Sequence, residues 1–248
     1  FPWADHNRSK AAMKLHVGLD HRGHFPAFAT VTDGLRHDVP VGRQFDFPKG
    51  SVVVIDKGYT DYGWYKQLTD KGIFFVTRQR TNAKYRVIER REVNRELGVT
   101  SDQIIELTGA QLKDKAIPRL RRIGYRDLDT GKHYVFLTNH LRLCAKTVAD
   151  VYKDRWQVEL FFKALKQNLK IHAFVGNSRN AVLTQIWVAL CTYLLLSYLK
   201  FLSKTGWSEQ RIMRLLQANL FSKKDLMALI RPSPPEVQAG PPQLALWA

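Results

Sequence analysis

The longest uncharged stretch of the chain places the strongest constraint on its fold. Residues 181–199 read AVLTQIWVALCTYLLLSYL and carry no charged side chain over 19 positions. A helix of that length could cross a membrane. However, polar residues interrupt it at Thr184, Gln185, Thr192 and Ser197, and no second stretch of this kind accompanies it. The sequence therefore favours a helix buried in the core of a soluble domain, with a membrane span as the alternative that detergent-free solubility would exclude.

The net charge points to a polyanionic partner. The 248-residue chain has 39 Lys and Arg residues against 22 Asp and Glu residues, a net charge of +17. Such an excess repels itself unless an anion offsets it, and nucleic acid is the leading candidate. A basic enzyme or a ribosome-associated protein is the alternative. With 45% hydrophobic residues, the chain can form one large domain or a core that carries an insertion.

The ends and the cysteines give further expectations. Cys144 and Cys191 have no CxxC spacing and lie among apolar residues, so we expect buried free thiols, as is typical of a cytoplasmic protein. No signal peptide is recognisable, and the first residue is not methionine, so we expect the chain to begin within a longer protein.

The first third of the chain has the pattern of an α/β protein. Two apolar runs flank a predicted turn at Gly23, as in a β-hairpin. The continuous β-branched run Val52–Ile55 is typical of a strand buried on both faces. The predicted elements are the hairpin strands Leu15–Leu19 and Phe25–Val31, the strand Val52–Ile55, a helix over Asp61–Lys71 and a strand over Ile73–Thr77.

Basic residues dominate the middle of the chain, residues 81–133. Short alternating runs at Tyr85–Ile88 and Arg119–Tyr125 predict exposed strands, so we interpret this region as a β-rich insertion. DNA contact by part of it is the functional interpretation, and a charged surface excursion is the alternative. A turn at Asp129–Gly131 precedes another predicted strand in HYVFLTN.

The last third is predicted to be helical. One helix should begin at Thr147, with Asp150 as an acidic partner in its first turn, and run through Lys170. The uncharged helix and a shorter one from Ser208 follow.

Asp56 stands out because it ends the apolar strand VVVID. Proteins of the α/β class bind ligands at the C-terminal ends of such strands. An aspartate that merely terminates the strand in a turn is the alternative.

A second group of polar residues lies in VYKDRWQVELFFKALKQNLK. At about 100° per residue, Tyr152, Arg155, Glu159 and Lys166 fall within an arc of about 60° beside the apolar stripe, and Lys163 extends this polar edge. Pairing of Arg155 with Glu159, worth about 0.2–0.5 kcal/mol, would explain two of these charges without any function.

The spacing Tyr152-x2-Arg155-x3-Glu159-x6-Lys166 resembles the Tyr-Arg-Glu-Lys motif of bacterial insertion-sequence DDE transposases that have a β-rich insertion in an RNase H-like, retroviral-integrase-like core. FPWADHNRSKAAMKLHVGLDHRG resembles the segment that follows the first catalytic aspartate, and VVVIDKGYTDY the segment that carries the second. FLTNHL and FVGNSRNAVLTQIWVALCTYLL also fit. The likeness covers residues 1–202.

The resemblance implies a role for each matching residue. Asp56 corresponds to the second catalytic aspartate and Glu159 to the catalytic glutamate, and both would be metal ligands for Mg²⁺ in a two-metal site in which Mn²⁺ can substitute. The implied DNA- and phosphate-binding residues are Tyr152, Arg155, Lys163 and Lys166. The implied partners are the transposon ends and target DNA, bound by a homodimer, in a cytoplasmic protein that is nucleoid-associated when bound.

The first catalytic aspartate of the family is expected upstream of Phe1, since neither Asp5 nor Asp20 matches its position. We therefore expect an N-terminally truncated, inactive fragment of a Mg²⁺-dependent transposase that cleaves element ends and transfers the 3′-OH strand. The alternatives are a catalytically dead DNA-binding inhibitor and another RNase H-like nuclease such as a resolvase.

The same interpretation divides the chain into regions. The predicted regions are 1–80 as the first part of the core, with its first strand missing; 81–133 as the basic insertion; 134–222 as the second part of the core, with the glutamate helix; and 223–248 as a proline-rich tail without fixed structure. A metal site built from His16, His21, His24 and His37 is a further alternative, but hairpin and loop histidines in a basic protein are usually solvated.

Overall fold

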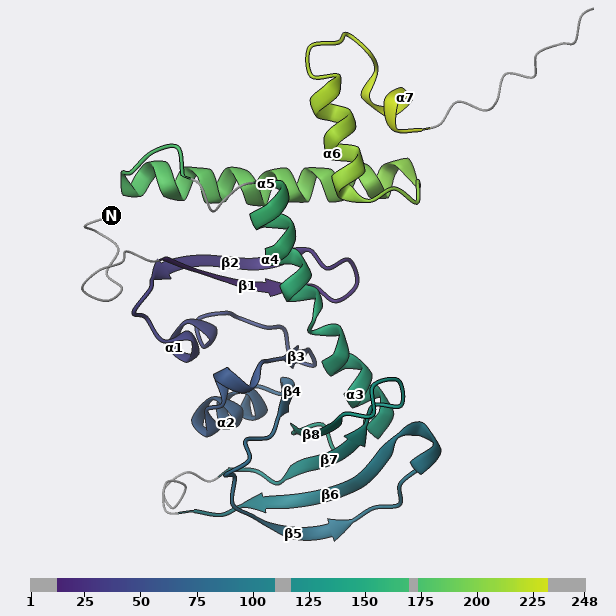
Figure 1. The fold of residues 1–248 in the computed structure, drawn as a ribbon. Coiled ribbons are helices and arrows are strands. Elements are labelled where there is room, and N and C mark those ends of the chain that lie inside the picture. The colour runs from purple at the N-terminus through teal and green to yellow at the C-terminus, as the bar shows by residue number, and fades with distance from the viewer. Residues whose placement is uncertain (1–12, 110–116, 170–173, 232–248) are drawn as a thin grey trace, which may run out of the picture. The chain divides into compact units, whose positions relative to one another are not determined.

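The computed structural model describes residues 13–109, 117–169 and 174–231 (Figure 1). The chain forms two compact units, Phe1–Lys163 and Ala164–Ala248. The strands all lie in the first unit: β1 (Met13–Leu19), β2 (Pro26–Asp33), β3 (Val52–Val54), β4 (Phe74–Arg78), β5 (Tyr85–Arg90), β6 (Val99–Leu107), β7 (Leu120–Arg126) and β8 (His133–Thr138). The helices are α1 (Asp38–Gly42), η1 (Lys57–Tyr59), α2 (Tyr62–Asp70), η2 (Arg95–Leu97), α3 (Ala145–Asp154), α4 (Gln157–Asn168), α5 (Arg179–Ser203), α6 (Glu209–Ala218) and α7 (Leu226–Ile230).

The strands of the first unit form two sheets. β1 and β2 pair as an antiparallel hairpin, and the other six strands form a sheet in the order β3-β4-β8-β7-β6-β5. Among the described strands, β3 and β4 are the one parallel pair. The predicted α/β fold class is confirmed.

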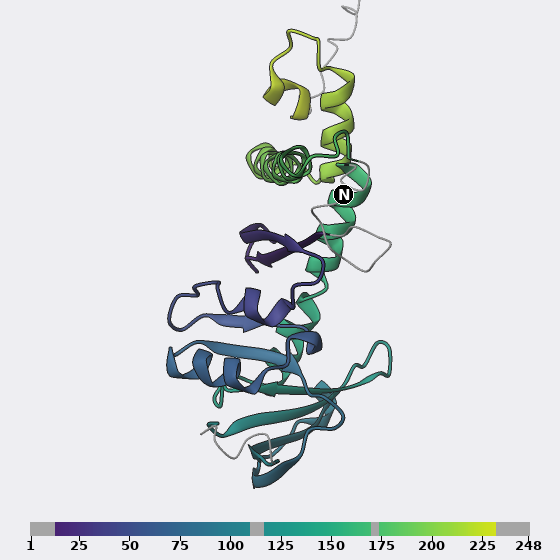
Figure 2. The same ribbon diagram turned by 90° about the vertical axis from the view of Figure 1, so that its left-hand side faces the viewer.

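Helices cover both faces of the six-stranded sheet (Figures 1 and 2). Successive side chains of a strand point to opposite faces, so neighbouring residues of β4 contact different helices. Phe75 stacks on Tyr65 of α2, with ring centroids 4.3 Å apart. Val76 belongs to a second apolar cluster with Val148 and Tyr152 of α3. The sheet is therefore the middle layer that fixes α3 relative to β3 and β4.

The strands of the basic middle region extend this same sheet. β7 pairs with β8 and β6 pairs with β7, so β7 lies in the interior of the sheet. Leu120 and Ile123 on β7 are fully buried, so the prediction of an exposed strand at Arg119–Tyr125 was wrong. β6 was not predicted at all.

One local prediction in the first unit also differs from the structure. Val52–Ile55 was expected to be buried on both faces, but β3 pairs only with β4 among the described residues and Val52 is 39% exposed. The hairpin turn predicted at Gly23 is confirmed, and His24 directly after it adopts the left-handed backbone, with φ of 55°. The helix predicted over Asp61–Lys71 is confirmed as α2, whose first turn Asp61 caps by accepting a hydrogen bond from the Trp64 N–H.

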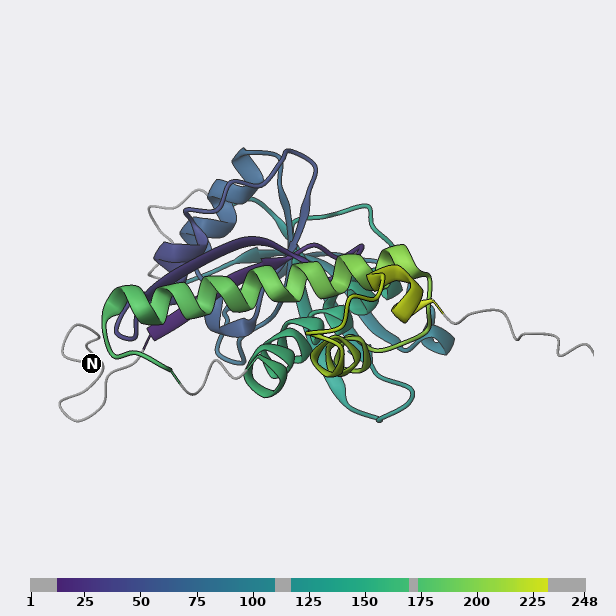
Figure 3. The same ribbon diagram turned by 90° about the horizontal axis from the view of Figure 1, so that it is seen from above.

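The second unit contains one continuous long helix, α5, with α6 running across it (Figures 1 and 3). Ser178 caps α5 by accepting a hydrogen bond from the Ala181 N–H. Leu196 of α5 packs with Ile212 of α6 and Ile230 of α7 in a small apolar cluster. By length and composition α5 could span a membrane, and it is the one such helix in the described part of the chain. Only 33% of its most apolar 18-residue window is buried, and Leu195 and Phe201 are 63% and 71% exposed, so the prediction of a helix buried in the core holds for one side of α5 only.

The C-terminal region and the cysteines need corrections. The predicted tail begins at 223, but Leu226–Ile230 forms α7, and residues 232–248 lie outside the described part of the chain. Cys144 and Cys191 are free thiols, as predicted, but both are exposed rather than buried. Cys144 lies at the start of α3, where backbone N–H groups of Thr147 and Lys146 lower its pKa.

Candidate metal and phosphate site

β3 and the turn after it position Asp56. The parallel pairing continues one residue past β3, where the Ile55 N–H donates to the Val76 carbonyl. Asp56 then begins η1, and its Oδ1 accepts a hydrogen bond from the Gly58 N–H at 2.9 Å. The side chain is 48% exposed, and its second oxygen faces Arg155. Asp56 is thus the turn-capping aspartate of the alternative interpretation, yet it also presents an oxygen to a cation.

A tight turn separates α3 from α4, so the prediction of one helix from Thr147 through Lys170 was wrong. α3 begins at Ala145, after Cys144, without a side-chain cap. The N–H groups of Arg155 and Trp156 donate to carbonyls three residues back, each at 3.2 Å. Hydrogen bonds of this spacing wind the chain more tightly than an α-helix does. The turn therefore places Tyr152 and Glu159 on different helices, whereas the predicted polar stripe assumed one continuous helix.

Arg155 lies between the two predicted catalytic carboxylates. Its Nη1 is 2.9 Å from Glu159 Oε1 and 3.7 Å from Asp56 Oδ2. Burial alone would lower the pKa of Arg155, but the neighbouring Glu159 and Asp56 carboxylates more than offset that effect and raise it. The structure therefore brings Asp56 and Glu159 to one cation, although 103 residues separate them in the sequence (159 − 56).

Tyr152 supports this arrangement from the core. Its ring packs on Phe136 of β8, with centroids 5.0 Å apart, and the Arg155 guanidinium lies 5.6 Å from the Tyr152 ring centroid. Burial raises the pKa of the Tyr152 hydroxyl, so the side chain is a neutral phenol at physiological pH. The ring therefore holds Arg155 in place through packing and through the attraction of a cation to an aromatic face.

One oxygen of Glu159 is buried without a hydrogen-bond partner. Glu159 Oε1 binds Arg155, whereas Oε2 is inaccessible to solvent and unpaired. A buried carboxylate oxygen without a partner is costly, and such atoms are typical of ligand sites. Carboxylate oxygens are the ligands that Mg²⁺ prefers, so Asp56 and Glu159 fit a divalent cation. Among the described residues, no third His, Cys, Asp or Glu joins these two in a ligand group.

The two predicted lysines follow on α4. Lys163 is exposed one turn after Glu159, at the end of the first unit. Lys166 is exposed two turns after Glu159 and belongs to the second unit. The structure thus brings Asp56, Arg155, Glu159 and Tyr152 together within the first unit. The roles of all six residues stay predictions.

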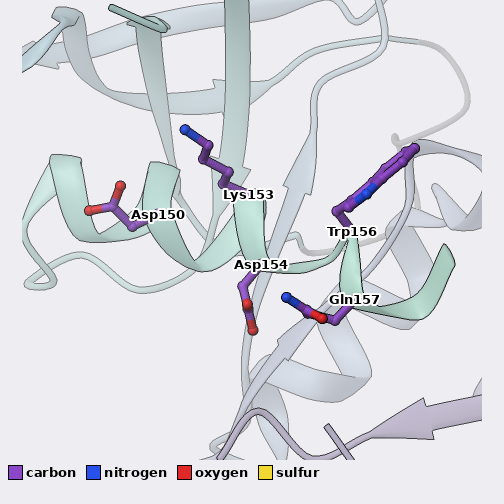
Figure 4. A pocket seen from close by; sticks show the side chains of 5 residues that line it. All are labelled: Asp150, Lys153, Asp154, Trp156 and Gln157. Carbon is purple, nitrogen blue, oxygen red and sulfur yellow. The ribbon is translucent and has the colours of Figure 1, made fainter. Parts of the chain in front are cut away.

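A second polar cluster, not predicted as a unit, lies beside the same turn. His21 and His24 of the β1–β2 hairpin both contact Asp154, the last residue of α3. Asp154 also lines an open pocket with Asp150, Lys153, Trp156 and Gln157 (Figure 4). Figure 4 shows the Gln157 amide directed towards Asp154. Two of these residues were weighed as histidine ligands, but nothing in the sequence linked them to Asp154.

Comparison with known proteins identifies the family of the chain. Residues 2–195 match the family described as the transposase DDE domain. The chain is 34% identical to a Sinorhizobium fredii protein named as a transposase. The aligned 236 residues are 94% of this chain and 66% of that protein. It is 33% identical to a Geobacillus stearothermophilus protein named as a transposase for insertion sequence element IS5377. The aligned 201 residues are 80% of this chain and 52% of that relative.

A third relative, from Synechocystis, is named as a transposase for insertion sequence element IS4SA and is 26% identical over 221 residues, which is 85% of this chain and 60% of that protein. The chain belongs to the transposase DDE domain family. It spans roughly half to two thirds of the length of these relatives, at 52–66%. The predicted family is confirmed, and the mixed sheet with its helices is consistent with the RNase H-like fold expected for it.

Proposed function

We propose that this chain carries part of the catalytic core of an insertion-sequence transposase that cleaves DNA at the element ends and joins the 3′-OH to target DNA. The family as a whole implies polynucleotidyl transfer or nuclease activity on DNA. The observation that carries the proposal is the shared contact of Asp56 and Glu159 with Arg155, next to an unpaired buried oxygen of Glu159.

Transposase DDE domains generally use divalent metal ions, and the donor set here favours Mg²⁺, with Mn²⁺ as a substitute. Asp56 and Glu159 would hold the metal through their carboxylate oxygens. The chemistry supplied by a bound pair of Mg²⁺ ions is a lowered pKa of water and neutralisation of charge on the leaving 3′ oxygen. The hydrogen bond from the Gly58 N–H keeps one Asp56 oxygen fixed, so the other is oriented before any metal arrives.

Arg155 would serve as the alternative cation of this site. While no metal is bound, its guanidinium neutralises both carboxylates. A divalent ion between the same oxygens would repel it, and a DNA phosphate offers two oxygens in the forked geometry that guanidinium binds well. Lys163 and Lys166 would add sequence-independent phosphate contacts. Tyr152 would orient Arg155 in both states.

A two-metal site needs a third carboxylate, and in the family that this chain resembles it lies on a core strand whose position neither Asp5 nor Asp20 matches. β1 pairs only with β2, and β3 only with β4, in the part of the chain that the structure describes, so each has an edge that another strand could use. We propose that the 248-residue chain binds DNA but does not cleave it. Homodimer assembly on DNA and a nucleoid-associated cytoplasmic location belong to the same proposal.

The test uses a full-length version of the protein and DNA bearing an element end. Asp56→Asn and Glu159→Gln should abolish Mg²⁺-dependent cleavage while leaving DNA binding within a few-fold of the unmodified protein. Asp70→Asn is a matched control, since Asp70 lies on the surface and pairs only with Lys66 among the ion pairs found. Unchanged cleavage in either active-site variant would refute the assignment.

Two further assays separate the remaining candidate functions. A pre-cleaved end offered with target DNA distinguishes a transposase, which joins it, from a resolvase-like nuclease, which does not. An assay of the 248-residue chain by itself distinguishes an inhibitor from a self-sufficient enzyme. An inhibitor would bind element ends and block their cleavage, whereas an enzyme would cleave them. Robust cleavage by the chain alone would contradict the proposed inactivity.

A further inference from the structure

We propose that His21, His24 and Asp154 form a binding site for a divalent transition-metal ion of the zinc class, distinct from the Asp56–Glu159 site. His21 Nδ1 lies 2.5 Å from Asp154 Oδ2, and His24 Nε2 lies 3.2 Å from the same oxygen. The three ligand atoms all lie within 4.8 Å of one another, and this is the one such group among the described residues.

These distances are close to those of a coordinated ion. Zn²⁺ binds imidazole nitrogen and carboxylate oxygen at about 2.0–2.2 Å, which in a tetrahedron separates neighbouring ligand atoms by about 3.4 Å. The His24–Asp154 distance already matches that separation. The His21–Asp154 distance needs to lengthen by about 1 Å, and the His21 side chain is 71% exposed, so it can move without disturbing the core.

The backbone of the hairpin turn presents both histidines on one side. The Asp20 carbonyl accepts a hydrogen bond from the His24 N–H, and Asp20 Oδ1 accepts one from the Arg22 N–H. His24 adopts a left-handed backbone with a φ of 55°, which is uncommon outside glycine but favoured by histidine at the end of a hairpin turn. The two rings meet edge to face, with centroids 6.2 Å apart.

The basic residues on either side of Asp154 form ion pairs with other carboxylates. Lys153 pairs with Asp127 and Asp129, and the neighbouring Arg155 pairs with Asp56 and Glu159. Among the described residues, the ion pairs of Asp154 are those with the two imidazoles. With neutral imidazoles, the cluster offers two nitrogens and one carboxylate with a net charge of −1, which suits a divalent cation.

The ligand types decide which cation it is. Imidazole nitrogen favours Zn²⁺, Co²⁺ and Ni²⁺, whereas Mg²⁺ selects oxygen ligands. Three protein ligands would leave a fourth position for water or another ligand. Of the three, Asp154 also lines the open pocket, where the Gln157 amide points towards it (Figure 4). The bound ion would clamp the hairpin turn to the end of α3, one residue before Arg155. It would therefore act as a structural cross-link beside the catalytic carboxylates.

The experiment measures Zn²⁺ and Co²⁺ binding to the tag-free 248-residue chain in excess Mg²⁺, by titration calorimetry and by the visible spectrum of Co²⁺. We expect one ion per chain. His21→Ala, His24→Ala and Asp154→Asn should each weaken binding by at least about tenfold. His37→Ala is the matched control, because His37 is an exposed histidine outside the cluster.

The competing explanation is an ion-pair network only. It would be established if the unmodified chain bound no Zn²⁺, or if the three variants bound it no more weakly than His37→Ala. A combined Asp56→Asn and Glu159→Gln variant must retain the ion, since its loss there would assign the metal to the other site. Should His21→Ala fail to fold, His21→Asn removes the ring while keeping a polar side chain, and circular dichroism of each variant confirms the fold.

Discussion

Asp154 and Arg155 are consecutive residues, yet they belong to clusters of opposite chemistry. Arg155 joins two carboxylates, Asp56 and Glu159, in a site of oxygen ligands already balanced by a cation. Asp154 joins two imidazoles, with no lysine or arginine pairing with it among the described residues. Asp154 is the last residue of α3, and Arg155 is the first residue of the turn that follows. The comparison teaches that two consecutive residues can serve clusters of opposite charge, because neighbouring side chains on a helical backbone point about 100° apart.

The largest expected effect separates the two sites by activity. In a full-length version of the protein, Asp56→Asn combined with Glu159→Gln should lower Mg²⁺-dependent cleavage by at least about a thousandfold, because the metal loses its protein ligands. Zn²⁺ binding by the same variant should stay within about twofold of the unmodified protein. Parallel measurement of cleavage rate and zinc affinity checks both. A joint loss would show that the clusters are one site.

The converse change should have a smaller effect. Asp154→Asn should weaken Zn²⁺ binding by about 10–100-fold, since an amide is a poorer ligand than a carboxylate. Mg²⁺-dependent cleavage measured without zinc should change by less than about threefold. The control is Asp150→Asn, one turn earlier on α3, whose carboxylate pairs with Lys146 instead. A cleavage defect as large as that of Glu159→Gln would place Asp154 in the catalytic site.

Arg155→Ala tests whether this guanidinium competes with metal. DNA affinity should fall by about tenfold, because a charge-assisted phosphate contact is lost. Mg²⁺ binding at Asp56 and Glu159 should become several-fold tighter, because the cation that occupies their oxygens is gone. Arg155→Lys keeps the charge and should show a weaker form of both changes. Titration calorimetry with Mg²⁺ in the absence of DNA measures the metal affinity of each variant. Weaker Mg²⁺ binding by Arg155→Ala would contradict competition between the guanidinium and the metal.

The smallest effect concerns the support under Arg155. Tyr152→Phe keeps the ring on Phe136 and removes only the hydroxyl, so we expect less than about 1 kcal/mol change in the free energy of unfolding. Tyr152→Ala leaves a cavity and should destabilise the protein by about 3–5 kcal/mol. Urea denaturation of both variants measures the difference. Equal destabilisation would show that the hydroxyl, not the ring, holds the site.

The local geometry of the candidate residues could be predicted from their spacing. Asp56 follows an apolar strand, and Arg155 pairs with Glu159 four residues later, whereas their roles stay predictions. The break between α3 and α4 could not be seen in the sequence. Neither Arg155 nor Trp156 is a helix-breaking residue such as glycine or proline, and the apolar periodicity continues past them. Asp154 could not be linked to His21, since 133 residues separate them and no motif spans that interval.

β6 was missed for a different physical reason. Its polar residues suggested a surface segment, but Asp102 is buried and forms a two-pronged salt bridge with Arg121 of β7, at 2.8 Å and 2.6 Å. A buried charged pair contradicts the alternation of apolar and polar residues that identifies strands in a sequence. Arg121 reads as a surface residue for the same reason, which is why β7 was expected to be exposed.

The two outer strands of the six-stranded sheet differ in how well they resist self-association. β5 carries Arg86, Glu89 and Arg90 and has a register shift between Val87 and Glu89, features that discourage edge-to-edge pairing. β3 is Val52–Val54, with no charge and no irregularity in its pairing. With three residues, β3 is protected mainly by its shortness. The same open edge that could accept a further core strand could also accept a second copy of the chain, and a charged substitution at Val52, which is 39% exposed, would oppose that pairing.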